Sequence, residues 1–241
     1  MNKLLTTLFA LAVACVTASV QAQAPAPAAS AAAPAPAQQK PAAPAGAKSL
    51  EAKTAMCMGC HNIKGYQASF PEVYKVPMIA GQSAKYIASA LTAYKKGDRK
   101  HPTMRGIATS LSDQDITDIA GYYEAMGKEA GSQALPDQPA RQPDAQVAAL
   151  LQKAACVSCH GSNFSKPIDV YPKIAGQHES YLFVALKAYK TDNNPAVGRS
   201  NAVMGAIARQ FNNNDLKALA KYVSSLDGEL KTVPENRFHN H

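Results

Sequence analysis

Two pentapeptides carry the residues best suited to chemistry in this chain, Cys57-Met58-Gly59-Cys60-His61 and Cys156-Val157-Ser158-Cys159-His160. Each has two thiols three residues apart and a histidine directly after the second thiol, and on a helical turn these side chains share one face. Cys-x-x-Cys-His is the attachment signature of c-type haem, in which the thiols bond the porphyrin edge and the histidine binds the iron. The sequence therefore predicts two haem c groups, held covalently by Cys57, Cys60, Cys156 and Cys159, with His61 and His160 as axial ligands.

Other chemistries open to a Cys-x-x-Cys pair are a redox dithiol, half of a zinc site and a disulfide. A zinc site needs its four sulfurs to converge, and a dithiol needs no fixed histidine directly after it. The histidine is present in both copies. The haem interpretation is therefore favoured over the other three.

The sixth iron ligand decides between an electron carrier and a catalyst. Met104 lies in a polar, glycine-bearing segment, interpreted as a loop, and Met204 recurs at the matching place. A thioether is a soft ligand that favours Fe(II), and His/Met ligation raises the reduction potential. A lone methionine more often fills a core, but the recurrence favours Met104 and Met204 as ligands. The histidines and methionines without a matching partner are interpreted as surface, loop or packing residues: His101, His178, Met56, Met58, Met78 and Met126.

The elements that must position these residues form an internal repeat. Cys57 recurs as Cys156, the tetrapeptide Ile-Ala-Gly-Gln at 79–82 recurs at 174–177, and Asp115 recurs as Asp215. Two domains are therefore predicted, over 48–130 and 144–241, joined by a Pro/Gln-rich link over 131–143.

The periodicity within each copy is helical, and no alternating strand pattern competes with it. The fold class is therefore all-α. Each domain is too small to be held together by side chains alone, so the haem must supply much of its core. The predicted helices are a segment from residue 48 or 49 to the first motif, 145–155 capped by Asp144, 83–95, 178–190, and closing helices after Asp113 and Asn214.

Six further residues are candidates to support the haem. A backbone carbonyl at Pro77 or Pro172 is expected to accept the second N–H of the axial histidine, although both prolines also serve to shape a loop. Buried carboxylates need hydrogen-bond donors. The candidate donors to the haem propionates are Gln82, Gln177, Tyr86 and Tyr181.

The N-terminal residues 1–24 have the features of an export signal, and 25–47 are almost only alanine, proline and glutamine, which predicts a disordered leader. We therefore expect a periplasmic protein. Cys15 is interpreted as part of a discarded signal rather than as a lipidation site, and an uncleaved anchor stays open.

The formal net charge is +8, and the basic residues are scattered rather than gathered in one block. They are interpreted either as solvated helix faces or as charges that steer the protein to an acidic redox partner or to an anionic membrane surface. A nucleic-acid partner is not expected.

The tandem motifs, each followed by Pro-x-Ile-Ala-Gly-Gln, a Tyr-containing helix and a late methionine, resemble the cytochrome c4 family of dihaem class I cytochromes c over about residues 48 to 230. The resemblance implies two all-helical cytochrome c domains related by an approximate twofold, with adjacent haems. It also implies a periplasmic carrier between a quinol-oxidising complex and terminal oxidases or reductases. The segments 62–66 and 70–74 of the first copy replace the shorter Gly-rich loop at 160–162 of the second copy, so the resemblance does not extend to equal potentials of the two haems or to the partner recognised near the first haem.

Two functions follow as hypotheses. The first is an electron carrier that is not an enzyme and has no small-molecule substrate. The second is a dihaem enzyme or enzyme subunit, peroxidase-like or oxidising thiosulfate or sulfide, which needs one iron without a strong sixth ligand.

Overall fold

The computed structural model describes residues 49–129 and 135–234. The predicted export signal, the Ala/Pro-rich leader and the terminal His239 and His241 lie outside the described residues. Within the described part of the chain, no helix is long and apolar enough to cross a membrane.

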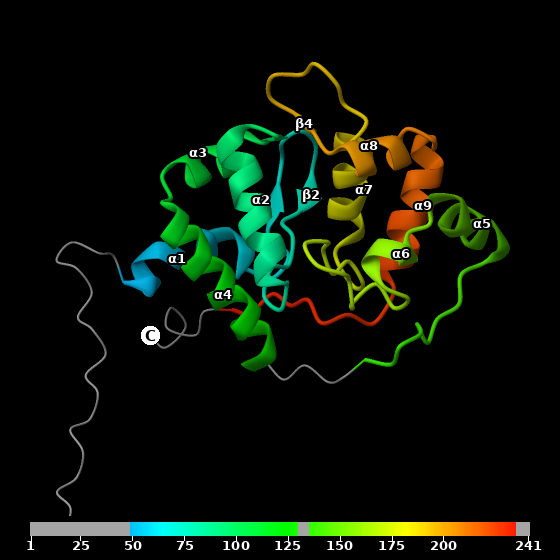
Figure 1. Ribbon diagram of the computed structural model, residues 1–241, viewed down its shortest axis with the longest axis horizontal. Coiled ribbons are helices and arrows are strands. Elements are labelled where there is room, and N and C mark those ends of the chain that lie inside the picture. The colour runs from blue at the N-terminus through cyan, green and yellow to red at the C-terminus, as the bar shows by residue number, and fades with distance from the viewer. Residues whose placement is uncertain (1–48, 130–134, 235–241) are drawn as a thin grey trace, which may run out of the picture. The chain divides into compact units, whose positions relative to one another are not determined.

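Each half of the described chain is a small set of helices with short two-residue strands (Figure 1). The first half contains α1 (Leu50–His61), β1 (Gln67–Ala68), β2 (Tyr74–Lys75), α2 (Ala84–Lys96), β3 (Arg99–Lys100), α3 (Pro102–Thr109) and α4 (Asp113–Glu129). The second half contains α5 (Ala145–Ala154), α6 (Val157–His160), α7 (Glu179–Ala188), β4 (Gly198–Arg199), α8 (Ala202–Ala208) and α9 (Asn213–Ser224). The all-α prediction is confirmed in its main feature, and the short strands were not predicted.

Side-chain caps explain where the helices begin. The hydroxyl of Ser49 accepts the Ala52 N–H at 3.2 Å, and the carboxylate of Asp144 accepts the Val147 N–H at 2.8 Å. Asn212 and Asp215 form a reciprocal capping box at the start of α9. Such caps satisfy backbone N–H groups that have no partner inside the helix.

Two predictions of local structure were wrong. Met104 and Met204 lie on the short helices α3 and α8, not in loops. Pro102 is compatible with this helix because it occupies the first turn, where its missing N–H is not needed. The predicted helix over 145–155 ends at Ala154, because Ala155 is left-handed with φ 48°, and the second haem motif begins a separate short helix.

The core of each half forms where the second and the closing helices meet. In the first half, α2 packs on α4 through Ile87, Leu91, Ile119 and Tyr123, all buried. In the second half, α7 packs on α9 in the same way. The glycine of each Ile-Ala-Gly-Gln tetrapeptide lies against the closing helix, and the Gly81 N–H donates to Tyr123 O at 2.8 Å.

The end of the described chain returns to the first half. Residues 227–234, here called the C-terminal strap, leave α9 and run towards α4 (Figure 1). The Lys231 N–H donates to Ala80 O at 3.0 Å, and Asn62 Nδ2 donates to Val233 O at 2.7 Å. The matching residue of the second half, Asn163, donates to Pro136 O at 2.7 Å. In each half, the asparagine near the haem motif therefore binds the segment that follows a closing helix. Asn62 binds the segment after α9, and Asn163 binds the segment after α4.

Candidate haem-binding sites

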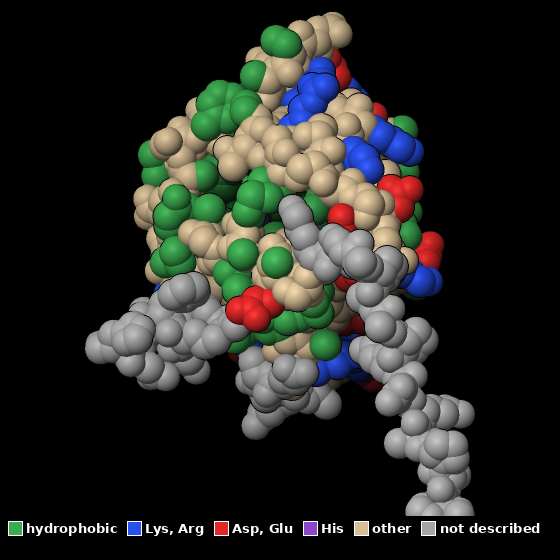
Figure 2. Space-filling model, turned by 90° about the vertical axis from the view of Figure 1, so that its left-hand side faces the viewer, with side chains coloured by type: hydrophobic (Ala, Val, Ile, Leu, Met, Phe, Trp, Pro, Cys, Tyr) green, Lys and Arg blue, Asp and Glu red, His purple; other side chains and the backbone are tan. Residues whose placement is uncertain are grey.

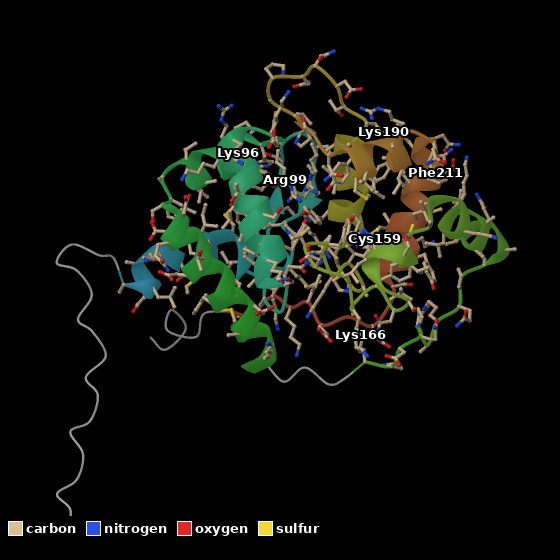
Figure 3. The ribbon with its side chains drawn as sticks, in the orientation of Figure 1. Lys96, Arg99, Cys159, Lys166, Lys190 and Phe211 are labelled. Atoms are coloured by element: carbon tan, nitrogen blue, oxygen red, sulfur yellow. The ribbon has the colours of Figure 1, made fainter. Side chains whose placement is uncertain are left out.

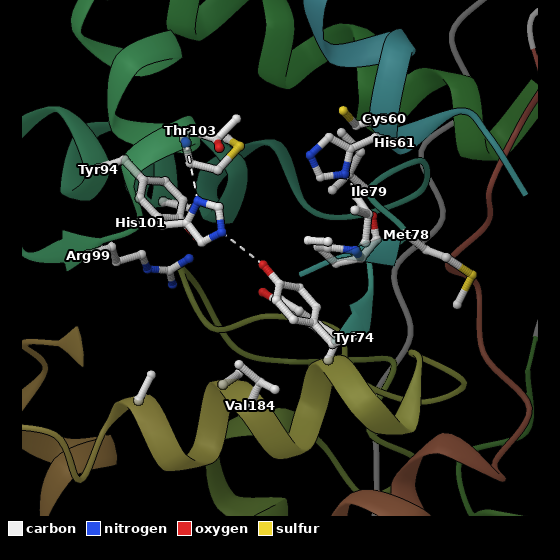
Figure 4. A pocket seen from close by; sticks show the side chains of 18 of the residues that line it. Cys60, His61, Tyr74, Met78, Ile79, Tyr94, Arg99, His101, Thr103 and Val184 are labelled. Atoms are coloured by element: carbon white, nitrogen blue, oxygen red, sulfur yellow. Dashed lines mark hydrogen bonds between the residues drawn. The ribbon is translucent and has the colours of Figure 1, made fainter. Parts of the chain in front are cut away.

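A cavity of about 400 Å³, lined by residues of both halves, brings the predicted residues of the first haem site together. Cys57, Cys60, His61 and Met104 all line it, although they come from α1 and α3. Apolar side chains from α2 and α4 of the first half and from α7 of the second half form much of the remaining wall. Figure 4 shows His61 and Cys60 on one side of this space and Tyr94, His101 and Thr103 on the other.

Both histidines predicted as axial ligands are held by a backbone carbonyl. His61 Nδ1 lies 2.8 Å from Pro77 O, and His160 Nδ1 lies 2.9 Å from Pro172 O. Burial lowers the pKa of both histidines, so each ring is neutral, with its proton on Nδ1 for the carbonyl. The lone pair of Nε2 is then free to bind a metal.

The thiols are placed at two separate sites. All four described cysteines are unpaired, and burial raises the pKa of Cys57 and of Cys156 to about 11. Among the described residues, no group of three or more His, Cys, Asp or Glu side chains converges as a metal site would require. The geometry therefore gives no support to a four-sulfur zinc site.

The two methionines occupy equivalent positions on their helices. Each is the third residue of its helix, and its N–H donates to the capping residue, His101 Nδ1 at 3.4 Å for Met104 and Asn201 Oδ1 at 2.9 Å for Met204. Met104 is half-buried and packs against the core of the first half. Met204 is also half-buried.

A pair of half-buried arginines was missed by the sequence reasoning. Arg99 and Arg199 face each other across the antiparallel pair β3–β4, at the junction of the two halves where Figure 3 shows Arg99. Within the described residues, neither arginine forms an ion pair with an aspartate or glutamate. Buried charges are normally paired. Haem propionates are carboxylates, so this pair of guanidinium groups fits the predicted cofactor. Arg99 recurs as Arg199 at the spacing that relates Met104 to Met204, and this was the available signal.

The predicted tyrosines bind these arginines. Arg99 donates to Tyr86 Oη at 3.1 Å, and Arg199 donates to Tyr181 Oη at 3.1 Å. Each guanidinium also lies over tyrosine rings, with Arg99 5.2 Å from the Tyr86 centroid and Arg199 5.5 Å from that of Tyr181. The tyrosines therefore orient the two arginines, and their own contact with a propionate stays a prediction.

The predicted glutamines bridge the two halves. Gln82 donates to Lys173 O at 2.9 Å and accepts the Lys173 N–H at 3.0 Å. Gln177 makes the same two bonds with Met78, at 2.9 and 3.0 Å. Both glutamines are buried. The second amide N–H of each glutamine is the group that could donate a hydrogen bond to a propionate, and this contact stays a prediction.

Comparison with known proteins agrees with this geometry. The cytochrome c family model matches residues 43–126 and again 145–227. The chain belongs to the cytochrome c family. It is 28% identical over 187 residues to cytochrome c4 of Pseudomonas aeruginosa, a match that covers 76% of this chain and 90% of that protein.

Two further relatives bear on function. The chain is 29% identical over 203 residues to a thiosulfate dehydrogenase electron acceptor of Stutzerimonas stutzeri, covering 80% of this chain and 88% of the relative. The solved structure of Acidithiobacillus ferrooxidans cytochrome c4 matches with a TM-score of 0.52 and 27% identity, over 72% of this chain and 99% of that one. Two cytochrome c domains in tandem imply two haem c groups, and the chain is a dihaem, cytochrome c4-like electron carrier.

Proposed function

We propose that this cytochrome carries single electrons in the periplasm, with His61 and Met104 binding one haem iron and His160 and Met204 the other. The cavity that brings Cys57, Cys60, His61 and Met104 together is the observation that carries the proposal. With protein ligands on both sides of each iron, no coordination position is left for a substrate. The proposed activity is therefore electron transfer and not catalysis.

The haem supplies the chemistry, one-electron cycling of its iron between Fe(II) and Fe(III). The residues of the chain hold it and adjust its potential. Pro77 and Pro172 fix the orientation and tautomer of the axial histidines. Arg99 and Arg199 would neutralise the propionates at the junction, which would bring the two haems to adjoining edges of their domains.

The mouth of the first cavity suits contact with a redox partner. Met56, Tyr66 and Phe70 line this cavity and are also 54%, 42% and 40% exposed. Figure 2, which looks onto the side of the first half, shows hydrophobic side chains gathered on this face, with Lys and Arg side chains interspersed with Asp and Glu mainly along one edge. An apolar contact on a chain with a formal net charge of +8 favours an acidic partner. We propose a quinol-oxidising complex as donor and a terminal oxidase or reductase as acceptor, with a membrane surface as a further site of association.

The similarity to a thiosulfate dehydrogenase electron acceptor favours a second candidate. In this alternative the donor is a thiosulfate-oxidising enzyme, and the chain is its haem partner or subunit. A dihaem enzyme with one open coordination position would require that either Met104 or Met204 does not bind iron.

A redox titration of the holoprotein with and without CO tests the proposal. We expect two low-spin haems that do not bind CO. Met104→Ala and Met204→Ala should each lower the potential of one haem and open that haem alone to CO. Val203→Ala is the matched control, because Val203 precedes Met204 on α8, is 48% exposed and does not line the cavity, and it should leave both potentials unchanged. A wild-type haem that binds CO at rest would contradict the carrier function.

A further inference from the structure

The first half contains a hairpin that has no counterpart among the described residues of the second half. Strands β1 and β2 pair in antiparallel register, with Ala68 opposite Tyr74. Tyr74 is only 7% exposed and lines the cavity that holds Met104. The hairpin therefore brings one additional polar group to the first haem site.

Tyr74 reaches the methionine helix through His101. Tyr74 Oη lies 2.9 Å from His101 Nε2, and His101 Nδ1 accepts the Met104 N–H (Figure 4). Because Nδ1 is the acceptor of this bond, the ring proton lies on Nε2 and is donated to Tyr74. The imidazole thus connects the hairpin to the first turn of α3.

The second half has the cap without this connection. Asn201 Oδ1 accepts the Met204 N–H at 2.9 Å, and within the described residues the Asn201 side chain has no other hydrogen bond. The two methionine helices therefore begin in the same way, but only in the first is the capping side chain also hydrogen-bonded to a neighbouring element. This difference provides a natural control inside the same chain.

The hairpin is in turn fastened to the second half. The Lys75 N–H donates to Ser180 Oγ at 3.0 Å, and Glu72 forms an ion pair with Lys187 of α7. The rings of Tyr74 and Tyr181 lie 6.3 Å apart. A continuous set of contacts thus runs from α7 through Tyr74 and His101 to the backbone of Met104.

We propose that Tyr74 and His101 are positioning residues for Met104, and that through them the docking of the second half sets the potential of the first haem. The inference rests on the proposed ligation of iron by Met104. A thioether stabilises Fe(II), so loosening Met104 favours Fe(III) and lowers the potential. The second haem has no such link, and its potential is independent of this pair.

Two variants separate the link from the cap. Tyr74→Phe removes the hydroxyl and leaves the cap in place. His101→Asn keeps a capping oxygen, as Asn201 provides in the second half, and removes the link to Tyr74. Loss of one hydrogen bond should change the ratio of oxidised to reduced first haem about two- to tenfold at a fixed potential. The tenfold limit corresponds to about 59 mV for one electron.

The test is a redox titration of the full-length holoprotein, with the first haem identified by its loss of methionine ligation in Met104→Ala. Both variants should lower the potential of the first haem and weaken its methionine-to-iron absorption band, and Ser180→Ala should act in the same direction. Asn201→Ala is the matched control, and it should affect the second haem only.

The inference would be overturned if the potentials of both haems shifted equally, or if neither Tyr74→Phe nor His101→Asn shifted the potential of the first haem. In both cases Met104→Ala would still open the first haem to CO, so the proposed ligation would stand. A Met104→Ala protein with an unchanged first haem would instead refute the proposed ligation. A purely structural role of the hairpin would lower the unfolding midpoint of Tyr74→Phe without moving the potential of the first haem, and this result also counts against the inference.

Discussion

Replacement of Asn62 with alanine tests how firmly the C-terminal strap holds the first half. Asn62 directly follows His61 and is 5% exposed. Its Nδ2 donates to Val233 O at 2.7 Å, and its Oδ1 accepts the Tyr123 hydroxyl at 3.1 Å. Alanine removes both bonds and leaves the backbone of α1 unchanged. The variant therefore loosens the strap beside the first haem motif, with the bond from Lys231 to Ala80 left in place, and alters no predicted haem residue.

The expected cost follows from the burial of the two partners. Tyr123 is 0% exposed, and leaving its hydroxyl without an acceptor costs about 1–3 kcal/mol. The Val233 carbonyl belongs to a half-buried residue, so water replaces part of its bond, and this loss is about 0.5–1.5 kcal/mol. We expect Asn62→Ala to lower the free energy of unfolding by about 2–4 kcal/mol.

Denaturant unfolding of the holoprotein, followed by the haem absorbance and by circular dichroism, measures this loss. Tyr123→Phe removes the donor, so Asn62→Ala in that background should cost at least about 1 kcal/mol less than in the wild type. Asn163→Ala is the matched control, because Asn163 makes the equivalent bond to Pro136 in the second half. A loss below about 0.5 kcal/mol, or the same loss with and without the Tyr123 hydroxyl, would refute the reasoning.

Three further predictions address the strap, the arginines and a surface ion pair. Truncation after Gly228 removes the contacts of Lys231 and Val233 and should destabilise the first half more than the second, as measured by hydrogen exchange. Arg199→Gln removes a half-buried positive charge at the junction and should lower one haem potential by an amount on the order of 1 kcal/mol, as measured by redox titration. Asp115→Asn tests the pH dependence, because hydrogen bonds from Lys53 and then from Ser112 hold the pKa of Asp115 well below its usual range. The contribution of Asp115 to stability is therefore present above its unfolded pKa of about 3.9 and is lost as the pH falls toward the folded value, so wild-type unfolding curves should depend more steeply on pH below that point than those of the variant.

The features that could be predicted from the sequence are those that recur in both halves or have an unusual amino-acid composition. The two haem motifs, the helical halves and the pairing of Met104 with Met204 all follow from spacing within the repeat. The structure places the first set of haem residues around one cavity, as the spacing requires. The helix beginning at Pro102 was missed, because its proline and glycine suggest a loop when the cap supplied by His101 is not known.

Features that depend on distant contacts were not predicted. Arg99 resembles the other basic residues along the chain, and only its burial opposite Arg199 distinguishes it. Gln82 was assigned to the haem because the sequence does not show the backbone of Lys173 beside it. The hydrogen bond between Asn62 and Val233 joins residues 171 positions apart, and no local pattern indicates it.

The C-terminal strap also determines the order in which the molecule is completed. A polypeptide is made from its N-terminus, so the segment containing Asn62 is available long before Val233 exists. Contacts between such remote positions form late, since the intervening chain must first be brought together. The first half thus acquires its last hydrogen bonds only when Val233 has reached it, and until then its haem motif is less rigidly held than in the finished protein.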